Sequence, residues 1–383
     1  MRDLVEIGMG RTARPAYDFD DVQIVPSRRT RSSRDVSTAW QIDAYRFEIP
    51  LMTHPTDAIV SPATAIRIGQ LGGLGVLNAE GLWARHSDVD KLLFRLASAM
   101  YADDEAAAVR LLQQWHSAPI RIELLAETIG QMARAGVTAA ARVSPQHARD
   151  LAPDLVAAGI EILVVQGTIV SAEHVSRRAG AEPLNLEEFI ASLDVPVIAG
   201  GVGDYRTAMH LMRTGAAGVI VGYGASTSTS TGDVLGIGVP MATAVADAAA
   251  ARRDYLDETG GRYVHVIADG GVRTSGDIAK AIGCGADAVM LGEPLAAAAE
   301  APGNGLYWTA AAAHPSLPRS HVTNRSDGVD PPEHSIGIET LLFGPSSDPS
   351  GKVNLFGGLR RAMAKTGYSD LKEFQRVGLT VRS

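Results

Sequence analysis

Cysteine is nearly absent from this 383-residue chain, where it occurs once, at position 284. A single cysteine excludes an internal disulfide framework and any cysteine-based zinc site, and we expect no side-chain metal centre. No stretch reaches the roughly 18 to 20 apolar residues of a membrane helix. The first residues also lack the apolar segment of a secretory signal. We therefore expect a cytoplasmic protein that binds no membrane.

Basic residues are too few for a protein that binds nucleic acid through its phosphates. Lys and Arg number 35 against 43 Asp and Glu, which gives a net charge of -8, and nucleic-acid binding is therefore not expected. Hydrophobic residues make up 46% and charged residues 20%, so the chain can bury a large core and is not globally disordered.

Short apolar runs rich in Val and Ile recur along the chain, and many end in glycine. They do not alternate with polar residues, which is typical of strands buried on both faces of a parallel sheet. The runs cover residues 49–52, 74–77, 140–143, 161–165, 196–201, 218–224, 265–271 and 288–293. Helical patterns lie between them, for example at 61–71, 204–213, 239–253 and 274–282. The alternation predicts a single-domain α/β fold, a (β/α)8 TIM barrel over 1–383, with a doubly wound open sheet as the alternative.

Two segments interrupt this rhythm. Residues 78–139 carry only helical patterns, and residues 303–350 are rich in Pro, Ser and Asp. A long irregular stretch of this kind is usually functional. We interpret 303–350 as a flap or lid over the site, with a disordered connection as the alternative.

The loops that follow the strands form the active face of a barrel. After the sixth run, Gly222 and Gly224 precede six consecutive hydroxyl residues at 226–231. Glycines let the backbone approach a ligand, and hydroxyls can donate to phosphate or ribose oxygens. A flexible surface linker is the alternative.

The seventh and eighth runs end in residues suited to a nucleotide. Asp269 precedes Gly270 and Gly271, and its carboxylate could accept two ribose hydroxyls; an Asx turn is the alternative. Loops after the seventh and eighth strands are the usual phosphate site of a barrel, and Gly292 fits that role. Glu293 does not, because a carboxylate beside a phosphate is repulsive unless a cation intervenes.

Several motifs resemble the IMP dehydrogenase / GMP reductase family in their order along the chain. They are FDDVQIVPS at 19–27, IPLMTHPTDAIV at 49–60, QLGGLGVLN at 70–78, VIADGG at 266–271, MLGEPLAAAAEAPG at 290–303 and GGLRRAMAKTGYSDLKEF at 357–374. The chain is most similar to a compact IMP dehydrogenase-like branch without the paired CBS module. That module would sit in segment 78–139, which is too short to hold it.

This resemblance implies a site for a purine 5′-monophosphate. Asp269 matches the carboxylate that holds the ribose diol, and Gly271 and Gly292 match the glycines beside the phosphate. Gly270 lies beside Asp269 at the end of the seventh run, and Glu293 lies beside Gly292 at the end of the eighth. Thr227 matches a phosphate-binding serine. Gly222 and Gly224 match the catalytic loop, which in many members binds potassium. The resemblance further implies NAD as a cofactor and a homotetramer.

The residue at the position of the family's cysteine nucleophile is Thr229. A thiol with a pKa near 8.5 is a few per cent ionised at neutral pH, whereas a threonine hydroxyl is not ionised without an adjacent base. Thr231 is the remaining catalytic candidate of the loop. Cys284 precedes the eighth run, at the opposite end of the barrel, and we interpret it as a packing residue.

Other positions also depart from the family. His54 stands close to the expected phosphate, where it could supply the cation that Glu293 needs or simply pair with Glu293. Thr56 replaces the methionine that touches the purine. Gln166 replaces the aspartate that helps seat the dinucleotide. No clear Arg-Tyr flap pair is found, although Arg319 and Arg325 lie in the right stretch.

Three hypotheses follow. The favoured one is a purine-nucleotide-binding barrel without family-type redox activity, a pseudoenzyme with a regulatory role. The second is an active enzyme that oxidises IMP to XMP with NAD in GMP biosynthesis, or reduces GMP. The third is a barrel recruited to a different reaction.

Overall fold

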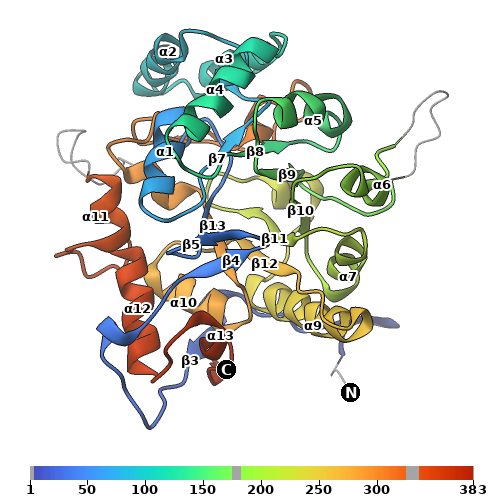
Figure 1. Ribbon diagram of the computed structural model, residues 1–383, viewed down its shortest axis with the longest axis vertical. Coiled ribbons are helices and arrows are strands. Elements are labelled where there is room, and N and C mark those ends of the chain that lie inside the picture. The colour runs from blue at the N-terminus through green and yellow to red at the C-terminus, as the bar shows by residue number, and fades with distance from the viewer. Residues whose placement is uncertain (1–3, 175–182, 325–335, 383) are drawn as a thin grey trace.

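A parallel barrel forms the body of the molecule (Figure 1). The computed structural model describes residues 4–174, 183–324 and 336–382. Eight strands are hydrogen-bonded in the order β6-β13-β12-β11-β10-β9-β8-β7. These strands are β6 (Leu51–Thr53), β7 (Val76–Asn78), β8 (Ala140–Val143), β9 (Ile162–Gln166), β10 (Val197–Val202), β11 (Gly218–Ala225), β12 (His265–Gly270) and β13 (Ala288–Leu291). Each coincides with one of the predicted runs, so the predicted (β/α)8 barrel is confirmed.

The barrel closes between its first and second strands. Met52 of β6 bridges Leu74 in parallel, just before β7 begins. The backbone N–H of Thr53 donates to the Leu74 carbonyl at 3.0 Å, and that of Leu74 donates to the Leu51 carbonyl at 2.8 Å. The sheet therefore has no open edge at this point, which distinguishes it from a doubly wound sheet.

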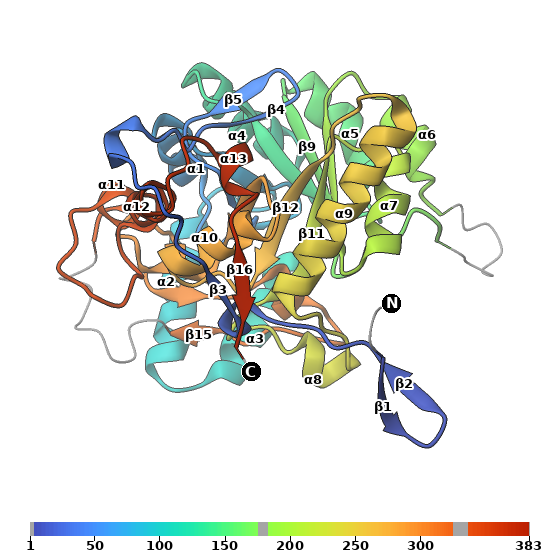
Figure 2. The same ribbon diagram turned by 90° about the horizontal axis from the view of Figure 1, so that it is seen from below.

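Helices surround the barrel (Figures 1 and 2). Their bounds are α1 (Pro62–Gln70), α2 (Val89–Tyr101), α3 (Glu105–His116), α4 (Ile122–Arg134), α5 (Ala148–Ala157), α6 (Leu186–Ala191), α7 (Tyr205–Arg213), α8 (Thr231–Leu235), α9 (Met241–Thr259), α10 (Ser275–Gly283), α11 (Ile338–Phe343), α12 (Leu355–Lys365) and α13 (Leu371–Phe374). Several begin at residues whose side chains cap the helix. The side chain of Ser61 accepts the Thr64 N–H before α1, and Asp204 and Thr274 form capping boxes before α7 and α10.

The helical segment 78–139 covers one side of the barrel. It contains the 3-10 helix η3 (Leu82–Ala84) and helices α2, α3 and α4, which lie together at the top of Figure 1. Arg121 donates its backbone N–H to the Ala84 carbonyl at 2.8 Å, which ties the start of α4 to η3. After α4 the chain enters β8, and the described segment between β7 and β8 contains no other strand.

Small antiparallel pairs complete the described part of the structure. The remaining strands are β1 (Val5–Gly8), β2 (Arg11–Ala13), β3 (Val22–Ile24), β4 (Trp40–Ile42), β5 (Tyr45–Phe47), β14 (Leu306–Tyr307), β15 (Thr323–Asn324) and β16 (Leu379–Val381), and the remaining 3-10 helices are η1 (Phe19–Asp21), η2 (Ser33–Asp35), η4 (Glu293–Ala297) and η5 (Ala310–Ala313). They pair as β1-β2, β3-β16, β4-β5 and β14-β15. Among the described residues, no helix is both long and apolar enough to span a membrane.

The predicted flap is only partly irregular. Residues 303–324 hold β14, η5 and β15, and α11 follows at 338–343. Within this segment, the Arg319 carbonyl accepts the Ser230 N–H at 3.0 Å, and the His321 N–H donates to the Ser228 carbonyl at 2.7 Å. The segment is therefore attached to the hydroxyl-rich loop after β11. Residues 325–335, which include Arg325, lie outside the described residues.

Candidate functional site

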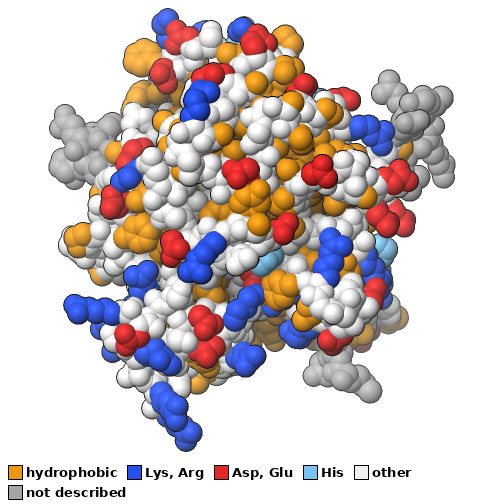
Figure 3. Space-filling view, viewed as in Figure 1, with side chains coloured by type: hydrophobic (Ala, Val, Ile, Leu, Met, Phe, Trp, Pro, Cys, Tyr) orange, Lys and Arg blue, Asp and Glu red, His pale blue; other side chains and the backbone are white. Residues whose placement is uncertain are grey.

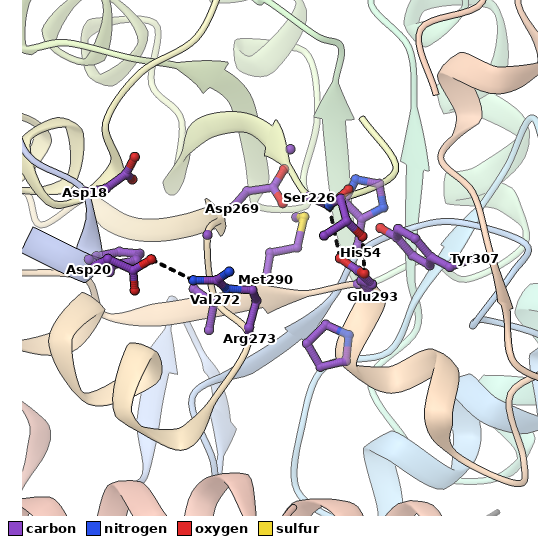
Figure 4. Close-up of a pocket in the computed structure, with 17 residues that line it drawn as sticks. Asp18, Asp20, His54, Ser226, Asp269, Val272, Arg273, Met290, Glu293 and Tyr307 are labelled. Atoms are coloured by element: carbon purple, nitrogen blue, oxygen red, sulfur yellow. Dashed lines mark hydrogen bonds and ion pairs between the residues drawn. The ribbon is translucent and has the colours of Figure 1, made fainter. Parts of the chain in front are cut away.

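A cavity of about 320 Å³ opens at the carboxyl ends of β11, β12 and β13 (Figure 4). Its volume falls in the range of small-molecule sites, roughly 300–1,000 Å³. Its lining consists of Asp18, Phe19, Asp20, His54, Gly224, Ser226, Thr227, Asp269, Gly270, Gly271, Val272, Arg273, Met290, Gly292, Glu293, Pro294 and Tyr307. Strand-end residues that the sequence singled out are thus brought together in one cavity.

Asp269 lies at the end of β12 and is 4% exposed. Its Oδ2 accepts a hydrogen bond from the Gln166 side-chain Nε2 at 3.0 Å, across the barrel from β9. Burial raises the pKa of this carboxyl to about 7, against a partial opposing effect of the Gln166 amide. Asp269 is therefore poised to hold or lose a proton near neutral pH, and its charged form would gain most from ligand hydroxyl donors.

Two of the predicted glycines are required by close contacts. A Cβ added at Gly222 would lie 2.1 Å from the Asp269 carbonyl oxygen, and φ at Gly222 is +114°. A Cβ added at Gly292 would lie 2.3 Å from the Tyr307 hydroxyl. Gly224, Gly270 and Gly271 also have positive φ. The glycines therefore bring the backbone of three strand ends close to the cavity.

Glu293 lies directly after Gly292 and is 4% exposed. The hydroxyl of Thr227 donates to its Oε1, and the backbone N–H of Thr227 approaches its Oε2 at 3.3 Å. Thr227, which the resemblance assigns to a phosphate, thus binds a carboxylate of the chain itself. Ser226, from the same loop, hydrogen-bonds the Ser228 hydroxyl at 2.8 Å.

His54 and Thr56 depart from what the sequence led us to expect. Burial and the neighbouring Arg142 lower the pKa of His54 to about 4, so its imidazole is neutral at pH 7 and does not supply a cation for Glu293. Thr56 lines neither this cavity nor the smaller one described below. Its hydroxyl donates to the Trp308 carbonyl at 2.5 Å, and its side chain is buried away from the cavities.

A second cavity of about 80 Å³ adjoins the first, and it contains both catalytic candidates, Thr229 and Thr231. The Thr229 hydroxyl donates to the Gly224 carbonyl at 2.7 Å and lies 3.2 Å from the Ser226 hydroxyl. Thr231 begins α8 and is 3% exposed. Cys284 caps the C-terminus of α10 and is buried, as the packing interpretation predicts.

Arg319 is the flap residue that reaches this region. Its Nη2 donates to the Thr168 hydroxyl at 3.3 Å, and Thr168 lines the smaller cavity. Ser320, the next residue, bridges Thr229 in antiparallel fashion. The segment is therefore placed beside the loop, while its registration against a family flap stays a prediction.

The residues at the dinucleotide position do not fit NAD. The Nε2 of Gln166, which stands in place of the aspartate, is directed to Asp269 and to the Met290 sulfur rather than to open space. The adjoining cavity of about 80 Å³ is far below the roughly 300 Å³ at which small-molecule sites begin. We derive no step through the dinucleotide.

The two loop carbonyls that the resemblance connects with potassium lie close to other parts of the chain. The Gly224 carbonyl accepts the Thr229 hydroxyl, and the Gly222 carbonyl faces Gly201, where a Cβ would lie 2.0 Å from the oxygen. Among the described residues, no group of three or more His, Cys, Asp or Glu side chains is placed to hold a metal ion.

Several lining residues were not singled out from the sequence as site residues, among them Asp18, Arg273 and Tyr307. Asp18 lies just before η1, and its Oδ1 accepts the Met241 N–H at 2.8 Å, which places the 18–20 segment at the mouth of the cavity. Arg273 pairs with Asp20 at 2.9 Å on the same side. Tyr307 lies on β14. Asp18 directly precedes the FDDVQIVPS motif at 19–27, and Arg273 follows Gly271 by two positions. Nothing in the sequence marked Tyr307.

Comparison with known proteins defines the class of this barrel. The family model described as IMP dehydrogenase / GMP reductase domain matches residues 16–315. The chain therefore belongs to the IMP dehydrogenase / GMP reductase family.

Its relatives include full-length mycobacterial proteins. The chain is 64% identical over 382 residues to an uncharacterized oxidoreductase from Mycolicibacterium smegmatis, covering 99% of this chain and 100% of that protein. It is 34% identical over 237 residues to the inosine-5′-monophosphate dehydrogenase of Aquifex aeolicus, covering 60% of this chain and 46% of that enzyme. A crystal structure of an IMP dehydrogenase/GMP reductase-like protein from Corynebacterium glutamicum superposes with a TM-score of 0.93 at 56% identity, covering 100% of this chain and 98% of that one.

Proposed function

We propose that this protein binds a purine nucleoside or nucleotide in the larger cavity and has lost the thiol-dependent redox chemistry of its family. Its role would then be sensing or regulation. The observation that carries the proposal is the state of Thr229. Its hydroxyl donates to the Gly224 carbonyl at 2.7 Å, so the group at the nucleophile position is directed to the chain's own backbone.

The hydrogen-bond partners of the Thr229 hydroxyl, the Gly224 carbonyl and the Ser226 hydroxyl, are not general bases that could activate it. A threonine hydroxyl needs an adjacent general base to attack carbon. His54 lines the same small cavity, but burial and Arg142 lower its pKa to about 4, which makes it a weak base. Burial raises the pKa of the Cys284 thiol to about 11, and this residue caps α10 at the other end of the barrel. Neither group replaces the missing thiolate.

Ligand binding is supported by the residues that remain. Asp269 is buried in the cavity and its carboxylate can accept a pair of ribose hydroxyls, as the resemblance implies. The glycines of three strand ends bring backbone groups close to the same space. The cavity volume of about 320 Å³ suits a purine nucleoside.

A second candidate function is a different reaction at the same cavity. Burial raises the pKa of Asp269 to about 7, and a general base works best when its pKa is near the operating pH. This carboxyl could then take a proton from a ligand hydroxyl rather than only bind it. Oxidation of IMP or reduction of GMP receives less support, since both use the thiol and the dinucleotide position is altered.

Thermal-shift and absorbance measurements test the proposal. Purified protein is heated with millimolar IMP, GMP, XMP, inosine, guanosine, NAD or an unrelated phosphate, with and without Asp269→Asn. A purine ligand should raise the wild-type melting temperature as concentration exceeds the dissociation constant, and the variant should lose most of that shift. IMP with NAD should give no NADH absorbance. No shift with any purine, or clear NADH formation, would refute the proposal.

A further inference from the structure

A basic patch lies on a molecule whose net charge is -8. Segment 25–35 contains four Arg and one Asp, and α12 contains three basic residues and no acidic one. Their basic side chains, which we call the α12 patch, are all exposed: Arg28, Arg29, Arg31, Arg34, Arg360, Arg361 and Lys365. Lys and Arg side chains gather at the lower left of Figure 3, where Figure 1 places α12. Positive charge is therefore concentrated at one place on an otherwise acidic chain.

Two segments that are far apart in the sequence form this patch. The backbone N–H of Arg31 donates to the Ala364 carbonyl at 2.8 Å, and its Nε donates to the Gly367 carbonyl at 3.4 Å. Helix α12 buries Leu359 and Met363 and leaves its basic side chains exposed. The packed helix and these hydrogen bonds therefore fix the relative positions of the two segments.

The charge of the α12 patch is not offset within the described parts of the chain. None of its seven side chains forms an ion pair with a described carboxylate, and Asp35 is the only acidic residue of the two segments. Glu373, on the next helix α13, accepts a hydrogen bond from the Ser369 hydroxyl at 2.7 Å. The hydrogen bonds from Ser369, together with the charges of Arg31 and Arg376, lower the pKa of Glu373. Basic groups held close together in this way attract an anion from outside.

We propose that the α12 patch is the docking surface for an acidic segment of a partner protein. Arginine and lysine donate charge-assisted hydrogen bonds to carboxylates, and several such donors spread over one surface suit a run of Asp and Glu residues. None of the seven side chains lines either cavity. The inference therefore goes beyond the proposed purine-binding function and does not depend on it.

Nucleic acid and a membrane fit the patch less well. A nucleic acid would extend beyond the patch over a chain of net charge -8, which repels phosphates. Bases also stack on exposed aromatic side chains, and the one aromatic residue of the two segments, Phe356, is 1% exposed. A membrane would be held by charge alone, because Val25 is the only large apolar side chain exposed in these segments. A short run of carboxylates meets neither difficulty.

Fluorescence anisotropy with defined anions tests this inference. The full chain is titrated into a labelled peptide of alternating Glu and Ser at 50 and 200 mM salt, and binding to a DNA duplex and to phosphatidylserine vesicles is measured in parallel. The Glu peptide should bind, and its affinity should fall at the higher salt because exposed charges are screened. The same peptide with Gln in place of Glu should not bind. Arg360→Ala/Arg361→Ala should weaken binding of the Glu peptide by about tenfold, the order of two exposed charge contacts.

Matched variants make the result decisive. Arg206→Ala/Arg253→Ala removes two exposed arginines from α7 and α9, changes the net charge equally and should leave the affinity unchanged. Arg28→Ser/Arg29→Ser alters the other segment and should weaken binding as the α12 variant does, even if that variant folds poorly. An equal loss in the control, an absence of peptide binding, or tighter binding of DNA or of vesicles than of the peptide would overturn this inference.

Discussion

The substitution Thr229→Cys introduces a thiol at the position that the resemblance assigns to the family's nucleophile, and it tests whether a missing thiol alone would explain the proposed loss of redox activity. The change removes a hydroxyl that donates to the Gly224 carbonyl at 2.7 Å. A hydrogen bond of this kind contributes about 1 kcal/mol, a small part of the roughly 5–15 kcal/mol that stabilises a typical domain. The variant should therefore fold, and its chemistry can be measured.

The new thiol should be reactive but not catalytic. With an ordinary pKa near 8.5, about 3% of it is thiolate at pH 7. Burial raises the pKa of Cys284 to about 11, which leaves about 0.01% as thiolate at the same pH. The thiolate populations therefore differ by about 300-fold, and alkylation by iodoacetamide, followed by intact mass, should modify position 229 first.

Turnover should stay absent because the thiol is not the only missing part. Gln166 is directed to Asp269 at 3.0 Å, and the space beside Thr229 measures about 80 Å³. Absorbance at 340 nm with saturating IMP and NAD should not rise above the Thr229→Ser control, which keeps a hydroxyl. A rate near 1 per second or more, typical of an enzyme, would show that one substitution repairs the site and would refute our account of several coupled losses.

Three further predictions concern stability, pH and assembly. Asp287→Asn removes the buried partner of Arg252 (2.7 Å) and Lys372 (2.6 Å) and should lower the free energy of unfolding, measured in urea, by about 3–5 kcal/mol. The control Glu258→Gln, in an exposed ion pair, should barely move the urea midpoint. Equal effects of the two substitutions would contradict this prediction. Burial raises the pKa of Asp269 from 3.8 to about 7, so the contribution of Asp269 to the free energy of unfolding is full below pH 4 and is lost as the pH rises to 7. The affinity of the protein for a ribose diol should increase as the pH approaches 7. Asp269→Asn should abolish both trends, as pH-dependent melting and binding curves will show. Light scattering should report a mass near four chains if the homotetramer implied by the family holds, and a monomer would exclude it.

The barrel could be predicted from the sequence because its signals are local. The run at 161–165 has four consecutive apolar residues, 162–165, and these lie in β9 (Ile162–Gln166), where every residue is buried. The side chains of Ser61 and Asp204, which cap α1 and α7, accept backbone N–H groups only three residues along the chain. Because these patterns involve only neighbouring residues, they can be recognised in the sequence without knowledge of the rest of the fold.

The hydrogen-bond partners and protonation states of the site residues could not be predicted in the same way. Asp269 and Glu293 were found because they follow strands, but the partner of Asp269 lies 103 positions away at Gln166. Thr56 is directed to a carbonyl 252 positions away, at Trp308. The expected cation at His54 fails because burial, which only the packed structure defines, lowers its pKa to about 4.

The loop after β11 contacts both positions at which the site departs from the family, because Thr227 binds Glu293 and Thr229 stands at the position matched to the nucleophile. Thr227 and Thr229 are separated by one residue, and each donates its hydroxyl to an acceptor of the chain, Glu293 or the Gly224 carbonyl. A loop that bound a phosphate with the first hydroxyl and presented a nucleophile from the second position would need both groups directed toward the ligand. Here internal acceptors stabilise the loop without a ligand. The Glu293 carboxylate and the Gly224 carbonyl therefore each accept a hydroxyl from the same short segment and hold it through two internal hydrogen bonds.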